Sequence, residues 1–443
     1  MPERARTRAA AHALALLLLA GCGTQLDPAP DVAENPLAVY DDSQVLALTP
    51  VGTFARGAPR PALAPLPELD FEEGSLGLPD SGDWGGELLL ADLSGDERAD
   101  LVVANAGENG YLAWSAPDSA LQPWIPRNTG LAGGPGLGAT CAVDLDGDGV
   151  CELVASTCER GVQVFVGERA NSWRAPAKPP PDSRPAGALA AGDLDLDGHP
   201  DVVAIGYPEG GLRVWLGDGA GSLREPIALA LLSTQDFGRS IALADLDLDG
   251  RLDIAVATRT GLRVFLQDPA LPERWREESR GLPVCGAPDS ILAVGAGKFT
   301  SQDRPQLAVC SACDPRLPPS ARDSLGVYAW NPANSAWEHV DKGLARSDCA
   351  CDLRAADFDG DGKLDLVALS PEHGAVIYLG DGAESFRAHG RLMGVHGRGH
   401  LAVGHADKNL LPDIAIATPL EHGLKESGGV RVFLNRRVIW DAR

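Results

Sequence analysis

The sequence predicts an all-β fold, a seven-bladed β-propeller of four-stranded antiparallel blades. Two observations predict it. An acidic motif recurs along the chain with a period near fifty residues, and a glycine-led apolar motif follows each copy. Self-similarity at a fixed period of this length is typical of repeat proteins, and repeated units of four short strands arranged radially form propellers.

The acidic motif is clearest at residues 192–204, which read GDLDLDGHPDVVA. Related stretches begin at Asp92, Asp144, Asp245 and Asp357, and two weaker ones begin at Lys298 and His405. From each first position to the next, starting at Asp92 and counting Asp193 as the third, the spacings are 52, 49, 52, 53, 59 and 48 residues. The motif therefore marks seven units.

The second motif reads Gly-x-x-apolar-aromatic and occurs once in each unit. Its copies begin at Gly110, Gly161, Gly211, Gly261, Gly326, Gly374 and Gly429. Because its register is independent of the acidic motif, it supports the count of seven.

Unit three shows the predicted strands in chain order. Residues 186–192 (AGALAAG) are small, which suits a crowded position near a central axis. Residues 201–206 (DVVAIG) are apolar at nearly every position, as expected for a strand covered on both faces. Residues 211–217 (GLRVWLG) alternate more, and the fourth strand, near Leu223 to Ala230, is the least regular.

A further pattern, an aromatic residue followed by five residues and Gly-Leu, marks fourth strands and predicts how the ring closes. It occurs at Trp124, Trp275 and Trp337, and again at Phe71, before the first unit begins. Unit seven ends soon after its third strand. We therefore expect the segment near residues 68–80 to supply the outer strand of blade seven and cover an open edge. The alternative is that Arg437 to Asp441 complete the blade.

Units such as FGRSIALADLDLDGRLDIAVAT, from Phe237, resemble the FG-GAP (VCBS) repeats of the integrin α-subunit propeller and its bacterial relatives. The resemblance covers residues 85–435. It implies a seven-bladed propeller with calcium in the hairpin between the first and second strands of a blade. It also implies that partners bind the face opposite the calcium loops.

The loop pattern is Asp-x-Asp-x-Asp-Gly-x-x-Asp, with side-chain oxygens at positions one, three, five and nine and a main-chain carbonyl at seven. Calcium tolerates such irregular oxygen shells, whereas magnesium demands a tight octahedron. An EF-hand is excluded because position twelve is alanine or valine and the flanks are strands. About five Ca²⁺ sites are predicted, with these residues as ligands: Asp92, Ser94, Asp96, Asp100, Asp144, Asp146, Asp148, Glu152, Asp193, Asp195, Asp197, Asp201, Asp245, Asp247, Asp249, Asp253, Asp357, Asp359, Asp361 and Asp365.

The loops are not equally complete. Units three, four and six match the pattern fully, and unit two has the longer carboxylate of Glu152 at position nine. Unit one has Ser94 at position three and Glu97 in place of glycine, so we expect weaker binding there.

Units five and seven are doubtful metal sites. Unit five has Lys298 at position one and Gln306 at position nine, and the lysine ammonium is a candidate to fill the place of the cation. Unit seven keeps Asp407, Asn409 and Asp413 but begins with His405, so we expect no ion in it.

The N-terminal region predicts an export signal and a tether rather than a folded domain. Residues 1–21 contain arginines and a short apolar run, and Leu19-Ala20-Gly21-Cys22 resembles a bacterial lipobox. The resemblance implies lipidation of Cys22; the alternative is an ordinary secretory signal. Residues 22–64 are expected to form a Pro/Ala-rich tether and residues 65–443 the propeller. Gly23 favours the outer membrane if the cell is Gram-negative.

Composition and charge limit the classes of function that this chain can have. The net charge of −24 argues against nucleic-acid partners. No later segment is apolar enough to span a bilayer, so we expect membrane contact only through the lipid anchor. No catalytic constellation recurs, which favours a non-enzymatic, extracytoplasmic calcium-binding propeller with a protein-interaction or adhesion surface. Loops near Gly134, Cys285 and Asp314 belong to the expected binding face. The alternatives are a lectin-like propeller and a polysaccharide-cleaving enzyme.

Eight cysteines follow Cys22: Cys141, Cys151, Cys158, Cys285, Cys310, Cys313, Cys349 and Cys351. An even number in an exported chain favours disulfides, whose connectivity the sequence does not determine. A zinc site formed by the last four is the alternative.

Overall fold

A computed structural model of the chain contains strands, turns and loops, and no helix occurs among the residues it describes. Contacts divide the chain into Met1–Val45 and Leu46–Arg443, and the described residues belong to the second unit. The structure describes residues 69–437 except 83, 85, 106–109, 132–135, 169–171, 176–178, 209, 230–231, 233–237, 271–273, 285–290, 312–323, 346–348, 372, 393–397 and 420–427. The signal, tether and lipobox predictions, and the loops near Gly134, Cys285 and Asp314, lie outside or largely outside these residues.

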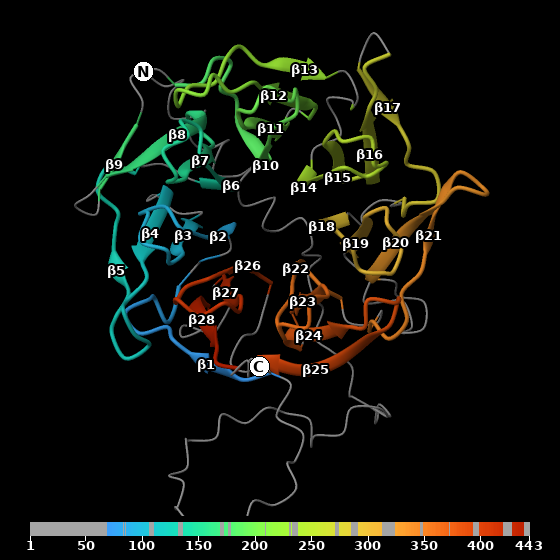
Figure 1. Cartoon of the computed structure of the whole chain (residues 1–443). Helices are drawn as coiled ribbons and strands as arrows, with labels where there is room; N and C mark the ends of the chain where they lie inside the picture. Colours follow the sequence, from blue (N-terminus) through green and yellow to red (C-terminus); the bar gives the residue numbers. More distant parts are fainter. Residues whose placement is uncertain are drawn as a thin grey trace, which may run out of the picture. The chain divides into compact units, whose positions relative to one another are not determined.

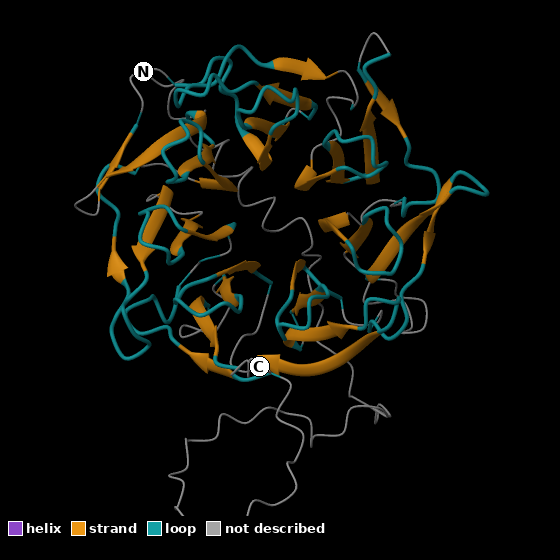
Figure 2. Cartoon of the chain, viewed as in Figure 1, coloured by secondary structure: helices purple, strands orange, loops and turns teal. Residues whose placement is uncertain are grey.

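Seven four-stranded antiparallel sheets stand around a central axis, which confirms the predicted fold class (Figures 1 and 2). Blade one comprises β2 (Leu88–Ala91), β3 (Asp100–Asn105), β4 (Gly110–Ser115) and β5 (Ile125–Pro126). Blade two comprises β6 (Gly136–Val143), β7 (Glu152–Thr157), β8 (Gly161–Glu168) and β9 (Ser172–Arg174). Blade three comprises β10 (Ala186–Gly192), β11 (Asp201–Gly206), β12 (Leu212–Trp215) and β13 (Ile227–Leu229). Blade four comprises β14 (Gly238–Ala244), β15 (Asp253–Thr258), β16 (Gly261–Gln267) and β17 (Trp275–Glu277). Blade five comprises β18 (Ile291–Gly297), β19 (Gln306–Ser311), β20 (Leu325–Asn331) and β21 (Ala336–His339). Blade six comprises β22 (Asp352–Ala356), β23 (Asp365–Ser370), β24 (Gly374–Gly380) and β25 (Phe386–Leu392).

The first strand of each blade lies nearest the axis, and the second strand is the buried centre of the sheet (Figure 1). Every residue of β11 is buried, because the adjacent blades cover both of its faces. One core, for example, joins Val203 and Ile205 of blade three to Ile254 and Val256 of blade four. The core is therefore a ring of clusters between blades, and each blade depends on its neighbours for burial.

Blade seven is completed by a strand from the other end of the propeller. It comprises β26 (His400–Gly404), β27 (Asp413–Thr418), β28 (Gly429–Asn435) and β1 (Phe71–Glu73). β1 pairs antiparallel with β28, with Phe71 opposite Asn435. The outer position in this blade is thus taken by the segment around Phe71.

The aromatic-x5-Gly-Leu pattern forms contacts between consecutive outer strands. The Trp124 amide donates to Leu76 O at 2.8 Å, and its indole nitrogen donates to Gly74 O at 2.8 Å. The same pair of contacts joins Trp173 to blade one and Trp337 to blade four. Gly130 has φ 91°, and a Cβ there would lie 2.0 Å from Trp173 O, so only glycine allows this approach. The pattern therefore links blade seven to blade one, blade one to blade two and blade four to blade five.

In the part of the chain that the structure describes, no helix is long and apolar enough to cross a membrane.

Candidate metal centres

The acidic motifs form the hairpin loops between the first and second strands of the blades. In blade three, β10 ends at Gly192, the loop runs through Asp193, Asp195 and Asp197, and β11 begins at Asp201. All first strands run in the same direction along the axis, so the loops lie on one face of the ring.

The position-nine carboxylate is a buried part of the backbone frame. Asp201 has 0% of its surface exposed. One of its oxygens accepts a hydrogen bond from Leu194 N at 2.8 Å, and the other accepts one from Gly217 N, after the third strand, at 2.9 Å. The corresponding carboxylates Asp253, Asp365 and Asp413 make the same two contacts. This side chain therefore ties the loop to the third strand.

The position-one carboxylate organises the turn. Asp193 accepts hydrogen bonds from Asp197 N at 3.2 Å and Gly198 N at 2.9 Å, and Asp245 and Asp357 repeat this pattern. Gly198 has φ 87°, a left-handed conformation that favours glycine. Backbone hydrogen bonds thus explain positions one, six and nine before any ion is considered.

Carboxylates converge in four blades. One oxygen from each member lies within 4.8 Å of the others in these groups: Asp144, Asp146 and Glu152; Asp193, Asp195 and Asp197; Asp245, Asp247 and Asp253; and Asp357, Asp359 and Asp361. Two carboxylates about 4 Å apart repel by roughly 4 kcal/mol at an effective dielectric near 20. In blade four, Asp247 Oδ1 is buried and has no hydrogen-bond donor. Such an oxygen fits a cation, because it is costly without one.

The electrostatics of these loops disfavour ionised carboxylates when no cation is present. Burial, opposed by hydrogen bonds from the backbone, raises the pKa of both Asp253 and Asp365 to about 7. Burial also raises the pKa of Glu152 to about 6, and the neighbouring Asp146 and Asp144 add to that shift. A bound cation would stabilise the charged forms.

Blade one is arranged differently. Asp96 forms an ion pair with Arg98 at 2.6 Å, and the buried Asp100 pairs with Arg127 at 3.0 Å. Burial raises the pKa of Asp100 to about 6, although the Arg127 charge opposes that shift. With Ser94 at position three, the predicted ligands of this blade do not form one of the carboxylate groups found among the described residues.

Blade five keeps the frame without the charge. Gln306 is fully buried, and its Oε1 accepts hydrogen bonds from Phe299 N at 2.8 Å and Thr300 N at 2.9 Å. Lys298, considered above as a replacement for the cation, is exposed, and no ion pair to it occurs among the described side chains. The neutral carboxamide thus keeps the loop contact of the position-nine carboxylate, since its oxygen accepts from the amide at position two.

Blade seven departs further from the pattern. His405 Nδ1 lies 3.2 Å from Leu411 O, and Asn409 Nδ2 donates to Asn435 O at 2.7 Å. Asp407 is paired with Arg436, which follows β28. Arg127 and Arg436 are the residues that sequence reasoning missed. Alignment of the units could have revealed Arg436, because Asp218, Asp268 and Asp381 stand at its position in other blades.

The disulfide expectation is wrong for five cysteines, which are free thiols: Cys141, Cys151, Cys158, Cys310 and Cys351. Cys141 and Cys310 lie on strands opposite Val154 and Ala293, where they pack as small apolar residues. Burial raises the pKa of Cys351 to about 12, which disfavours a thiolate and hence metal binding. Cys349 is disulfide-bonded, while Cys285 and Cys313 lie outside the described residues.

Solved structures share this fold at low sequence identity. Chains from two crystal structures of BBS1N in complex with ARL6DN, soaked with mercury and with lead, each have 13% identity and a TM-score of 0.50. The alignments cover 83% of this chain and 97% and 98% of those chains. A chain from an Agrocybe aegerita lectin that recognises non-reducing terminal N-acetylglucosamine has 16% identity and a TM-score of 0.45, with 69% of this chain and 80% of that chain covered. These likenesses concern the fold alone.

No curated protein matches the chain significantly. The model of the FG-GAP-like repeat family matches residues 92–155, 144–204 and 193–256. Each matched segment spans two successive acidic loops, which are the hairpins described above. The chain is therefore a seven-bladed β-propeller that contains FG-GAP-like repeats.

Proposed function

We propose that this chain is a non-enzymatic, calcium-binding propeller that presents a protein-interaction surface outside the cytoplasm. The observation that carries the calcium assignment is the convergence of carboxylates in blades two, three, four and six, with Asp247 Oδ1 buried and unpaired. The match to FG-GAP-like repeats supports it, since such repeats commonly hold calcium in this hairpin.

The donor set favours calcium over other divalent ions. The candidate ligands are carboxylates at positions one, three, five and nine with a carbonyl at seven, and no imidazole or thiolate takes part. Hard oxygen ligands suit calcium, and a loop on a hairpin can supply an irregular shell completed by water. In this role the ion would neutralise each loop and hold its hairpin.

The interaction surface is proposed on the face opposite the loops. Backbone contacts of the side chains at positions one and nine hold the loops on the calcium face, and the carboxylates make that face charged. The connections between blades emerge on the other face. Lipidation of Cys22 would keep the propeller at the cell envelope and outside the cytoplasm. Cys22→Ser should release the chain from membranes; if the unchanged protein is already soluble in the periplasm, the anchor is disproved.

Counting bound ions tests the calcium assignment. Purified propeller dialysed against excess chelator and then titrated with Ca²⁺ in a calorimeter should bind about four ions, one for each converged group. Magnesium at the same concentration should bind far less tightly. If the calorimeter detects no calcium, the assignment fails.

The interaction assignment needs its own discrimination. Glycan-array binding would support the lectin alternative, and release of oligosaccharides from polysaccharides would support an enzyme. Both assays should be negative for the protein-interaction proposal. Glycan binding would overturn the choice of a protein partner, and polysaccharide cleavage would overturn the non-enzymatic assignment.

A further inference from the structure

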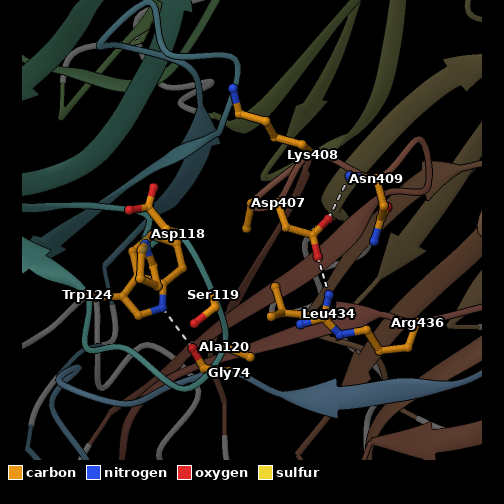
Figure 3. A pocket seen from close by; sticks show the side chains of 12 residues that line it. Gly74, Asp118, Ser119, Ala120, Trp124, Asp407, Lys408, Asn409, Leu434 and Arg436 are labelled. Carbon is orange, nitrogen blue, oxygen red and sulfur yellow. Dashed lines mark hydrogen bonds and ion pairs between the residues drawn. The ribbon is translucent and has the colours of Figure 1, made fainter.

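The seam between blades seven and one contains a cavity of about 340 Å³. Figure 3 shows Asp407 and Arg436 pointing toward each other on one side of it, with Trp124 and Gly74 on the other. The ring closes beside this cavity, within blade seven, because the outer strand β1 of that blade comes from the opposite end of the propeller sequence and pairs with β28.

Arg436 contacts two parts of blade seven, its loop and its outer strand β1. Its Nη1 pairs with Asp407 Oδ2 in the loop of blade seven, and its Nε donates to Glu72 Oε2 on β1 at 2.8 Å. Its main-chain nitrogen donates to Asp70 O at 2.6 Å, just before β1. The Arg436 side chain therefore connects β1, which completes blade seven, with the loop of that blade, which is equivalent to the candidate metal loops of other blades.

The repeat shows that this arginine is specific to blade seven. Asn435 N donates to Asp413, and Gly217 N makes the same contact to Asp201. Asn435 and Gly217 therefore occupy equivalent positions in blades seven and three. The next residue is an acid in four other blades: Glu168, Asp218, Asp268 and Asp381. Asp218 and Asp381 accept amide hydrogen bonds from the turn into their own fourth strands. Blade seven has no such turn, because β1 is its fourth strand.

The loop of blade seven also lacks the acceptors that an ion needs. Histidine at position one cannot accept the two amide hydrogen bonds that an aspartate accepts in blades three, four and six. Asp413 makes the same two amide contacts as the position-nine carboxylates of blades three, four and six, whereas Asp407, at position three, is paired with Arg436. The guanidinium thus stands beside the position-three carboxylate of the loop.

We infer that Arg436 is a built-in cation that closes the propeller: it replaces the metal ion in the loop of blade seven and holds β1 against that blade. The seam consequently stays closed when the other loops lose their ions. The part of this inference that concerns calcium rests on the proposed function, whereas the closure of the ring does not.

Hydrogen exchange of Arg436→Gln tests the closure. Arg431→Gln is a matched control, because Arg431 Nη1 also pairs with a glutamate of β1, Glu73, at 2.8 Å and is similarly exposed, 33% against 32%, but does not contact the loop. We expect roughly tenfold faster exchange in β1 and β28 for Arg436→Gln, in calcium and in chelator alike, and at most about twofold for the control. Arg436→Lys, which can hold one partner but not both, should be intermediate.

Ion counting separates the two parts of the inference. Asp407→Asn should leave the number of bound calcium ions unchanged, whereas Asp195→Asn should remove one. The inference is overturned if Asp407→Asn loses an ion, or if the two arginine variants exchange alike. If the unchanged protein binds no calcium, the proposed function fails, while the exchange experiment still decides the closure.

Discussion

Blades four and five contain the same loop with and without its charge. In blade four the position-nine Asp253 accepts the Leu246 amide at 2.7 Å, and in blade five the neutral Gln306 accepts the Phe299 amide at 2.8 Å. Both side chains are fully buried. The buried position-nine side chain thus accepts the loop amide in both blades, whether it is a carboxylate or a carboxamide. The carboxylates that converge in blade four fit the proposed cation.

The neighbouring arginine shows the same contrast. In blade five, position seven is Arg304, which lies over the rings of Trp330 and Trp337 and pairs with Glu278 at 2.8 Å. In blade four, Arg251 at position seven approaches Asp249 only to 4.0 Å. Arg304 therefore links the loop of blade five to blade four, through Glu278 and the carbonyl oxygen of Leu246. In blade four the only arginine contact to Asp247 among the described residues is that of Arg276, at 3.9 Å.

Removing calcium should have the largest effect and should act on the charged loops alone. An ion bound only by the folded state stabilises it by about 2.7 kcal/mol per site at a hundredfold excess over the dissociation constant. With four converged groups, chelation should lower the melting temperature by roughly 10 °C or more. Calorimetry with and without chelator measures this. Restoration by magnesium as complete as by calcium would contradict the assignment.

Removing the position-nine side chain should be the next largest effect, and it should appear in both blades. Asp253→Ala leaves Leu246 N and Gln267 N without their acceptor, and Gln306→Ala leaves Phe299 N and Thr300 N without theirs. Each buried amide costs about 1–3 kcal/mol when unsatisfied.

Chemical denaturation in chelator should therefore find both alanine variants destabilised to a similar extent. In calcium, Asp253→Ala should lose an additional ion-dependent increment. Equal losses for both variants in calcium would show that blade four holds no ion.

A position-three substitution isolates the ion. Asp195 Oδ1 accepts Asp197 N at 3.2 Å, and Thr300 Oγ1 accepts Gln302 N at the same distance, so each alanine variant loses the same backbone contact. Asp195→Ala should lose one calcium ion and up to about 2.7 kcal/mol, whereas Thr300→Ala should lose no ion and about 1 kcal/mol or less. The proposed difference between the loops of blades three and five is contradicted if titration finds the same number of bound calcium ions in both variants.

Chelation should also reverse the pH dependence of stability. Burial raises the pKa of Asp253 and Asp365 to about 7, well above the unfolded value, so the chelated folded state binds more protons than the unfolded state between about pH 4 and 7. Its stability should fall as the pH rises through that window. With calcium bound, protons compete with the ion, and stability should instead fall as the pH drops. Melting curves at pH 5 and 8 with and without calcium would show the crossing, and parallel profiles would exclude it.

The local parts of the propeller could be predicted from the sequence. The spans expected for the first two strands of blade three, 186–192 and 201–206, agree with β10 and β11. The acidic loops were located correctly because each is contained in nine consecutive residues. The third strand is shorter than expected, Leu212–Trp215, because pairing with its neighbours rather than hydrophobicity determines where it ends.

The repeats, their number and the carboxylates of each loop were determined by the sequence itself, because they depend on short-range periodicity. The tertiary structure decided which carboxylates meet, that Gln306 replaces a charge, and that Arg436 joins a loop to Glu72. Arg436 and Glu72 are 364 residues apart. Such contacts arise only when the ring closes, because they depend on how blades pack against one another, and no periodicity within one unit records that packing.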